Sequence, residues 1–311
     1  MAKWVGSPSP HLLKHMYICN DCPRKCNKER KALADIGKGF CNMGENPVIA
    51  RADLHFWEEP PISGDNGSGT VFFSGCNLQC IYCQNEKISR GKFGKEITIE
   101  ELKTIYKDLI NKGAHNINLV TGSHFVNAII ESLSEPLPVP VVFNCGGYES
   151  IETLKKLEGK IDIYIPDLKY SDNALATRYS KAPNYFEIAT TAIKEMYRQT
   201  GDYILDEDGL MKKGVIIRHL ILPNQLENTK RVIDWVKENF KSGQILFSLM
   251  SQFTPIKSCD IDSLNRRLTQ EEYDEIEQYL FDSGIEDGFM QELSSASEEY
   301  VPPFNIGEKI I

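Results

Sequence analysis

The chain has 311 residues, of which 41% are hydrophobic and 25% are charged, and its formal net charge is −9. This composition is that of a folded globular protein and excludes a disordered chain, while the length allows one barrel-sized domain with a small appendage or two average domains. The acidic balance argues against a nucleic-acid partner, because binding along a phosphate backbone requires a basic face.

The first predicted element is a metal site near the N-terminus, which we call the cysteine head after the four cysteines it carries. Its residues Cys19, Cys22, Cys26 and Cys41 have the spacing C-x2-C-x3-C-x14-C. In a reducing compartment, close thiols indicate metal or iron–sulfur ligands before disulfides. Because four thiolates complete one coordination sphere, the group predicts a closed site. Zinc and an iron–sulfur cluster both accept tetrahedral thiolates, so the sequence leaves the metal open.

From residue 68 onward, short β-branched or aromatic runs alternate with helical stretches. The runs lie at 69–75, 116–120, 139–143, 161–167, 214–222 and 244–250, and the helical stretches at 98–113, 124–133, 149–159, 172–200, 227–241 and 269–284. Nearly continuous apolar strands that alternate with helices predict a parallel sheet covered by helices. Six such units fit either an incomplete barrel or an open doubly wound sheet, because a full barrel has about eight.

Each of the six predicted strands ends in polar residues. The first runs into a loop with three cysteines, and the next five end in "TGSH", "NCGG", "PDLK", "RH" and "SQ". In parallel α/β architectures, ligands bind at the carboxyl ends of the strands. The pattern therefore predicts one active site built from all six strand ends.

The loop after the first strand reads "SGCNLQCIYCQN" and holds Cys76, Cys80 and Cys83 with the spacing C-x3-C-x2-C. Three thiolates can bind three corners of a [4Fe–4S] cube and leave the fourth iron without a protein ligand. An open coordination position is typical of catalytic rather than structural metal sites. The alternative is a zinc site that takes a distant fourth ligand, such as Cys145 or a histidine.

This three-cysteine loop, directly after a first strand and with Tyr82 before its last cysteine, resembles that of the radical S-adenosylmethionine superfamily. The resemblance implies that S-adenosylmethionine occupies the open iron and is cleaved by one electron from the cluster to a 5′-deoxyadenosyl radical, which abstracts hydrogen. It also favours the α/β partial (β/α)6 TIM-type barrel over the open sheet. The cofactor carries the difficult chemistry, and the protein positions and shields it.

Within that superfamily, residues 70–256 resemble the pyruvate formate-lyase activating enzymes, and especially an uncharacterised offshoot of that group. "IPDLKYSD" resembles their Asp-Leu-Lys strand end, which implies roles near cofactor and substrate for Asp167 and Lys169, the two candidate catalytic residues. "VIIRHLILPN" resembles the strand whose arginine pairs with the cofactor carboxylate, a role that falls to Arg218 and suits a bidentate guanidinium. In "SLMSQFTP", Gln252 is the candidate for the adenosine end.

Two strand ends depart from the activating enzymes. Their Gly-Gly-Glu element is replaced by "VTGSHF", so Thr121, Ser123 or His124 would accept hydrogen bonds from the cofactor amino group. Their Asp-Thr-Asn-Gly element becomes Asn144 followed by Cys-Gly-Gly. Both changes are compatible with radical generation and weaken the inference that the substrate is a glycyl-radical enzyme.

The sequence thus predicts an N-terminal segment, residues 1–66, with the cysteine head, and a radical S-adenosylmethionine barrel with a C-terminal extension over residues 67–311. We expect a radical enzyme that abstracts hydrogen from a protein or peptide, with flavodoxin or ferredoxin as electron donor. A small-molecule substrate and a non-enzymatic metal-binding scaffold are the alternatives. No apolar run approaches the roughly 20 residues that cross a bilayer, and the first residues lack the apolar stretch of a signal peptide, so we expect a cytoplasmic protein without membrane contact.

Replacing Cys19 and Cys22 together should lower the metal content of the protein while leaving the three-cysteine loop able to bind its cluster. Iron and zinc analysis of the unaltered protein identifies the metal of the head. About eight irons per chain indicate two cubes, and about four irons with one zinc indicate a zinc knuckle. An unchanged metal content in the double variant would contradict a metal site in the head.

Overall fold

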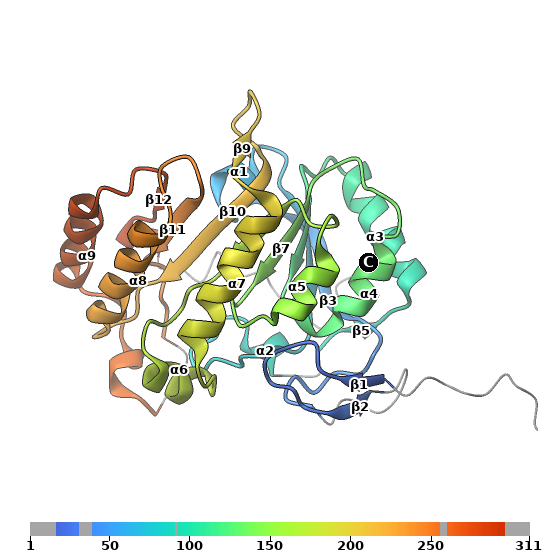
Figure 1. Cartoon of the computed structure of the whole chain (residues 1–311), viewed down its shortest axis with the longest axis horizontal. Coiled ribbons are helices and arrows are strands. Elements are labelled where there is room, and N and C mark those ends of the chain that lie inside the picture. Colours follow the sequence, from blue (N-terminus) through green and yellow to red (C-terminus); the bar gives the residue numbers. More distant parts are fainter. Residues whose placement is uncertain (1–16, 31–38, 91–92, 256–259, 296–311) are drawn as a thin grey trace, which may run out of the picture.

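The computed structural model describes residues 17–30, 39–90, 93–255 and 260–295. Its centre is a mostly parallel sheet whose strands follow the order β12-β11-β10-β8-β7-β6-β4-β3-β5 (Figure 1). The parallel strands are β4 (Ser68–Phe73), β6 (Ile117–Val120), β7 (Val141–Cys145), β8 (Ile163–Pro166), β10 (Met211–Leu220), β11 (Leu246–Met250) and β12 (Gly288–Met290). The predicted α/β partial barrel is confirmed.

The barrel is wider than the six predicted strands. β12 adds a seventh parallel strand beside β11, and β3 (Val48–His55) pairs antiparallel with β4 at the other edge. The two-residue strands β5 (Lys95–Glu96) and β9 (Ile204–Leu205) pair with β3 and β10. β12 has only three residues and β3 precedes the alternating part of the chain, so neither belongs to the repeating strand–helix pattern that revealed the others.

Helices cover the outer face of the sheet (Figure 1). They are α3 (Ile99–Asn111), α4 (Val126–Ser132), α5 (Ile151–Leu157), α6 (Asn173–Ser180), α7 (Tyr185–Thr200), α8 (Leu226–Asn239) and α9 (Gln270–Ser283). α3 begins at Thr98, whose hydroxyl accepts from the amide of Glu101 in a capping box, and α9 ends at Gly284 in a left-handed conformation. These caps satisfy backbone groups that a helix end leaves without partners. In the described residues, no helix is both long and apolar enough to cross a membrane.

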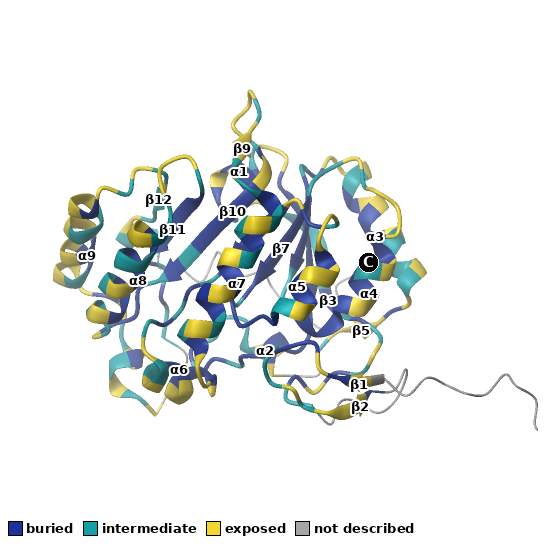
Figure 2. Ribbon diagram, viewed as in Figure 1, coloured by how far each residue is buried: buried dark blue, intermediate teal, exposed yellow. Residues whose placement is uncertain are grey.

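The core strands are buried on both faces, as a parallel sheet requires. Figure 2 shows β7, β10 and β11 almost wholly buried, and helices α7, α8 and α9 with exposed residues on their outer sides. The outward side chains of the strands pack under the helices, and the inward ones form a second apolar cluster inside the barrel. This inner cluster consists of Val142, Ile163, Ile165, Met211, Ile216, Leu246 and Ile62.

Ile62 reaches the inner cluster from a short helix, α1 (Pro60–Ser63), which comes after β3. β3 ends beside the start of β4, so the chain leaves it at the amino ends of the parallel strands. The segment 56–63 then turns into the barrel, where Pro61, Ile62 and Ser63 are buried. We call residues 56–63 the inner strap. It fills part of the lumen of this incomplete barrel.

At the start of the described chain, residues 17–30 form a two-stranded hairpin of β1 (Tyr17–Cys19) and β2 (Lys28–Arg30). The hairpin lies at the end of the sheet where α2 (Glu86–Ser89) follows the three-cysteine loop (Figure 1). The cysteine head is therefore placed at the carboxyl ends of the parallel strands.

Truncating Ile62 to alanine should lower the free energy of unfolding by about 2–5 kcal/mol, because it removes a fully buried side chain and leaves a cavity among rigid strands. Urea denaturation followed by circular dichroism measures the change. Ile204→Ala, at a position that is 54% exposed on β9, is the matched control and should change stability by less than about 0.5 kcal/mol. Equal effects of the two substitutions would show that the inner strap does not support the barrel.

Candidate functional site

The three-cysteine loop follows β4 and is held tightly against its surroundings. Gly75 has a φ of +81°, and a Cβ there would lie 2.5 Å from Met43 Cγ and 2.8 Å from the carbonyl oxygen of Cys41. The amide of Ile81 donates to the carbonyl of Tyr179 at 2.9 Å. A glycine is therefore required where the loop leaves the strand and contacts the cysteine head.

Cys80 is buried, and Cys76 and Cys83 are partly buried in the same loop. Burial and, to a smaller extent, the neighbouring Cys80 together raise the pKa of Cys76 to about 12. Burial also raises the pKa of Cys83. Three adjacent buried thiols are stable as thiolates only beside a compensating positive charge, which irons of a cluster would supply. The donor set thus fits a three-thiolate cluster site.

Within the described ranges, no three histidine, cysteine, aspartate or glutamate side chains are arranged as a ready-made cage for one metal ion. The residues proposed as ligands are nevertheless close to one another. The pKa of Cys22 is raised by burial first, and also by Glu149, Cys19 and Cys41. Burial likewise raises the pKa of Cys41, and Cys19 and Cys26 raise it further. The four cysteines of the head therefore lie close enough to one another to interact electrostatically.

A cavity of about 210 Å³ lies at the carboxyl ends of the parallel strands, beside the three-cysteine loop. Two cluster cysteines and five of the predicted polar residues line it, and these are Cys80, Cys83, Asn144, Asp167, Lys169, Arg218 and Gln252. Apolar and aromatic side chains complete much of the wall, among them Trp57, Phe72, Tyr82, Val120, Leu220 and Met250. The fold thus brings together the ends of six strands, β4, β6, β7, β8, β10 and β11, that the sequence could only place on one edge.

The guanidinium of Arg218 is at the centre of this cavity's charged network. Its Nε donates to Asp167 Oδ1 at 2.9 Å, its Nη1 to Glu58 Oε2 at 3.2 Å and its Nη2 to Asn144 Oδ1 at 2.7 Å. Lys169 Nζ lies 2.6 Å from the other oxygen of Asp167. All three guanidinium nitrogens are therefore engaged by the protein itself.

The carboxylates of this network differ in their protonation equilibria. Burial pushes the pKa of Asp167 upward, but the charges of Arg218 and Lys169 outweigh it and hold the pKa below the ordinary value. For Glu58 and Glu59, burial outweighs the attraction of Arg218, and the pKa of each is raised. Asp167 is thus the ionised partner of the two cations, and a proton binds more readily at the glutamate pair.

Sequence reasoning missed Glu58 and Glu59, which enter the site from the inner strap. Glu58 also accepts from Asn144 Nδ2 at 3.3 Å, and Glu59 Oε1 accepts from Ser248 Oγ at 3.1 Å. Glu59 Oε2 has no hydrogen-bond partner in the described residues and lies 3.8 Å from Arg218 Nη1. The one signal was a pair of acids directly before two prolines, outside the predicted barrel.

Thr121, Ser123 and His124 do not line the cavity. Thr121 has a φ of +59°, which turns the chain away after β6. Ser123 Oγ donates to Glu149 Oε1 at 2.7 Å, and His124 Nε2 lies 2.7 Å from the carbonyl oxygen of Ser74. Burial lowers the pKa of His124 to about 3, so its imidazole is neutral. A role for these three residues at the cofactor stays a prediction.

The cysteine head docks directly on the three-cysteine loop through Arg24. Arg24 Nε donates to the carbonyl of Asn77 at 2.7 Å, and its Nη2 donates to the carbonyl of Ser180 at 2.9 Å. The same guanidinium lies 3.8 Å above the ring of Phe40 and 5.2 Å from that of Tyr148. One cation of the head thus fixes the loop that carries the predicted cluster ligands.

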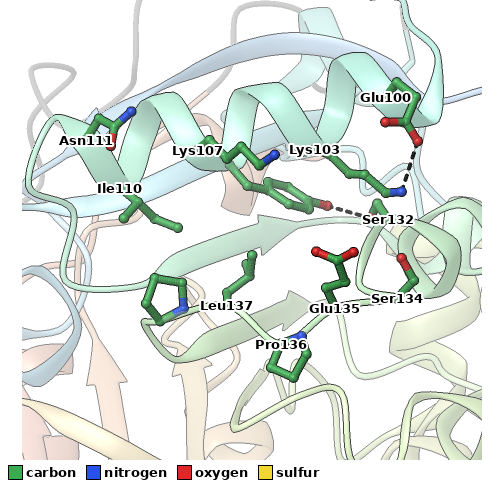
Figure 3. A pocket seen from close by; sticks show the side chains of 12 residues that line it. Glu100, Lys103, Lys107, Ile110, Asn111, Ser132, Ser134, Glu135, Pro136 and Leu137 are labelled. Atoms are coloured by element: carbon green, nitrogen blue, oxygen red, sulfur yellow. Dashed lines mark hydrogen bonds and ion pairs between the residues drawn. The ribbon is translucent and has the colours of Figure 1, made fainter.

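A second cavity, of about 380 Å³, lies between α3 and the loop before β7 (Figure 3). Lys103, Lys107, Ser132, Glu135 and Leu137 are among the residues that line it, and Lys103 pairs with Glu100 at 2.9 Å. It is larger than the cavity at the strand ends, but neither the cysteines nor the other predicted site residues reach it. The candidate functional site is therefore the smaller cavity at the strand ends.

The chain is similar in sequence to known proteins. Residues 62–165 match a family described as a 4Fe-4S single cluster domain. The chain is 32% identical over 274 residues to "Uncharacterized protein MJ0674" of Methanocaldococcus jannaschii, which covers 84% of this chain and 73% of that protein.

Two solved structures are similar at low sequence identity. The structure of SuiB of Streptococcus suis bound to S-adenosylmethionine has a TM-score of 0.46 and 13% identity, covering 72% of this chain and 50% of that one. A domain of a pyruvate-formate lyase-activating enzyme from Bacteroides vulgatus has a TM-score of 0.38 and 12% identity, covering 54% of this chain and 89% of that one.

The Arg218 network predicts the effect of removing its cation. Arg218→Gln should lower the free energy of unfolding of the metal-free protein by about 3–5 kcal/mol near neutral pH, because it leaves buried carboxylates uncompensated. Without the guanidinium, the pKa values of Glu58 and Glu59, which burial already raises, rise further above those of the unfolded chain, and the pKa of Asp167 also rises. The deficit relative to wild type should therefore shrink as the pH falls from about 7.5 to about 5.5.

Urea denaturation at the two pH values tests this. Arg198→Gln removes an exposed arginine that pairs with Glu158 and Glu195, and as the matched control it should cost no more than about 1 kcal/mol at either pH. A stability of Arg218→Gln equal to that of the control would mean that the buried network does not depend on Arg218.

Proposed function

The chain belongs to the same family as the M. jannaschii protein, and because residues 62–165 also match a 4Fe-4S single cluster domain, we propose that it is a radical S-adenosylmethionine enzyme. It would cleave S-adenosylmethionine reductively and use the product radical to abstract hydrogen from a substrate. The observation that carries the proposal is the position of Cys80 and Cys83. Both lie in the wall of a polar cavity at the carboxyl ends of the parallel strands, where a cofactor on a cluster iron would face the strand-end side chains.

Cys76, Cys80 and Cys83 would hold a [4Fe–4S] cluster, with its fourth iron left to the cofactor. When bound together, cluster and S-adenosylmethionine supply a one-electron cleavage that yields a 5′-deoxyadenosyl radical able to abstract hydrogen. The electron would come from a small redox protein such as flavodoxin or ferredoxin. Tyr82, buried in the same loop, would exclude water from the reactive side.

Five polar residues of the cavity would bind the cofactor and the substrate: Asn144, Asp167, Lys169, Arg218 and Gln252. Lys169 and Asp167 form a fixed pair that can offer both a cation and an anion to a polar ligand. Arg218 can bind the cofactor carboxylate only by exchanging one of its present partners for it, and Glu58, with its raised pKa, is the partner most readily neutralised. Glu58 therefore joins the proposed site.

Exposed aromatic side chains at the cavity favour a protein or peptide substrate over a small molecule. Trp57 lines it and is 61% exposed, and the adjacent Phe56 is 49% exposed. Exposed aromatic side chains next to a reaction cavity are typical of surfaces that bind polypeptides. Production of a glycyl radical on a partner protein is one form of this activity. A small molecule held by the Lys169–Asp167 pair is the second candidate.

In the cysteine head, Cys19, Cys22, Cys26 and Cys41 would bind a second metal, either zinc or an iron–sulfur cluster. Cys19, Cys22 and Cys41 are buried, which suits a closed structural site. Arg24 joins the head to the three-cysteine loop, so this metal would stabilise the part of the chain that packs against the loop.

Replacing any one of Cys76, Cys80 and Cys83 by alanine should abolish formation of 5′-deoxyadenosine, because two thiolates cannot hold the cluster in the required state. The assay is chromatography of the product after reduction with dithionite in the presence of S-adenosylmethionine. Cys145→Ala is the matched control, since Cys145 is buried at the end of β7 and does not line the cavity. It should retain both cluster and cleavage. Cleavage at the wild-type rate by any of the three loop variants would refute the proposed function.

A further inference from the structure

The sulfur of Cys80 receives a hydrogen bond from a residue distant in sequence. Ser180, the last residue of α6, donates from its Oγ to Cys80 Sγ at 2.9 Å. Ser180 is fully buried and Cys80 is nearly so. Nothing in the spacing of the cysteines indicates this contact, which joins residues 100 positions apart.

Two tyrosines extend this contact into a chain of hydroxyl groups. Tyr170 OH lies 2.6 Å from Ser180 Oγ, and Tyr82 OH lies 2.8 Å from Tyr170 OH. Each hydroxyl carries one proton. Because the proton of Ser180 points to the sulfur, Ser180 accepts from Tyr170, and Tyr170 in turn accepts from Tyr82. All three O–H dipoles are therefore directed toward Cys80.

The surroundings keep this chain dry. Tyr170 is fully buried, Tyr82 is 6% exposed, and the rings of Tyr179 and Phe253 pack 6.2 Å and 6.1 Å from that of Tyr82. A phenol keeps its proton at neutral pH, so both tyrosines can donate. In such an environment aligned hydrogen bonds polarise and strengthen one another.

We propose that Ser180, aligned by Tyr170 and Tyr82, is a positioning residue that raises the reduction potential of the cluster bound by Cys80. The inference rests on the proposed function, because it requires that Cys80 is a cluster ligand. On reduction the cluster takes up one electron from a low-potential donor and no proton moves. The added negative charge is shared with the cysteine sulfurs, so a hydrogen bond donated to sulfur stabilises the reduced state more than the oxidised state.

The three hydroxyls should contribute in a graded order. Ser180→Ala removes the donor to sulfur and should lower the equilibrium constant of reduction by about tenfold, which is about 59 mV for one electron. Tyr170→Phe leaves that donor in place but no longer polarises it, so a decrease of about twofold to threefold is expected. Tyr82→Phe, one bond further away, should have a smaller effect in the same direction.

The measurement is a potentiometric titration of the reconstituted protein, followed by the cluster's electron paramagnetic resonance signal without S-adenosylmethionine. The chain offers a matched control in Tyr106 and Ser132, a buried pair with hydroxyls 3.1 Å apart and, among the described residues, no cysteine partner. Tyr106→Phe and Ser132→Ala should lower the stability of the protein without changing the potential. If Ser180→Ala does not fold, Tyr170→Phe, which keeps all of the ring's packing, decides the matter.

The outcomes separate this inference from the proposed function. Potentials of Ser180→Ala and Tyr170→Phe that equal that of wild type, with an intact cluster that still cleaves the cofactor, would overturn the inference alone. Failure of the wild-type loop to assemble a cluster would overturn both. A decrease in potential for the three variants and not for the controls would establish the hydroxyl chain as the element that tunes the cluster.

Discussion

The site depends on one largely buried cation, the guanidinium of Arg218, whose side chain is 15% exposed. It joins β10 to the end of β8 through Asp167, to the end of β7 through Asn144 and to the inner strap through Glu58. These segments approach one another although each contributes polar groups to the interior of the barrel, where an unpaired charge would be costly. Arg218 makes their convergence stable, and in doing so it gives the cavity its charged wall.

The inner strap fills the open side of the barrel although no described strand closes it. In the described part of the chain, seven parallel strands with the antiparallel strands β3 and β5 at one edge leave a lumen that is not closed by strands. The inner strap fills that space with Ile62 at the amino end and with two glutamates nearer the chemistry. At the amino end of the lumen, apolar packing stabilises the barrel. At the other end, ion pairs of the two glutamates form part of the site.

Hydrogen bonds of Arg24 join the cysteine head to the three-cysteine loop. Arg24 of the head donates to Asn77 within the three-cysteine loop and to the backbone of Ser180, whose side chain in turn donates to Cys80. The position of the head, the shape of the loop and the environment of one cysteine sulfur are therefore linked through α6.

The sequence by itself determined the features that depend on local spacing. The alternation of apolar runs and helical stretches predicted the parallel sheet, because the spacing of apolar residues along a short segment depends on whether it is a strand or a helix. The C-x3-C-x2-C spacing placed three thiols in one loop after β4, and the polar strand ends placed Asn144, Asp167 and Arg218 on one edge. The boundary between an N-terminal segment and a barrel at residue 67 stays a prediction, and β3 and the inner strap from that segment pack within the barrel.

Only the tertiary structure decided which side chains meet. Glu58 reaches Arg218 across 160 positions of sequence, and no local pattern encodes a contact between segments so far apart. Ser123 and His124 are turned into the core by the left-handed backbone at Thr121, although their position at a strand end resembled that of ligands. The hydroxyl chain from Tyr82 to Cys80 forms for the same reason. Side-chain direction and partner depend on how α6, β8 and the loop pack together, and that packing is a property of the whole fold.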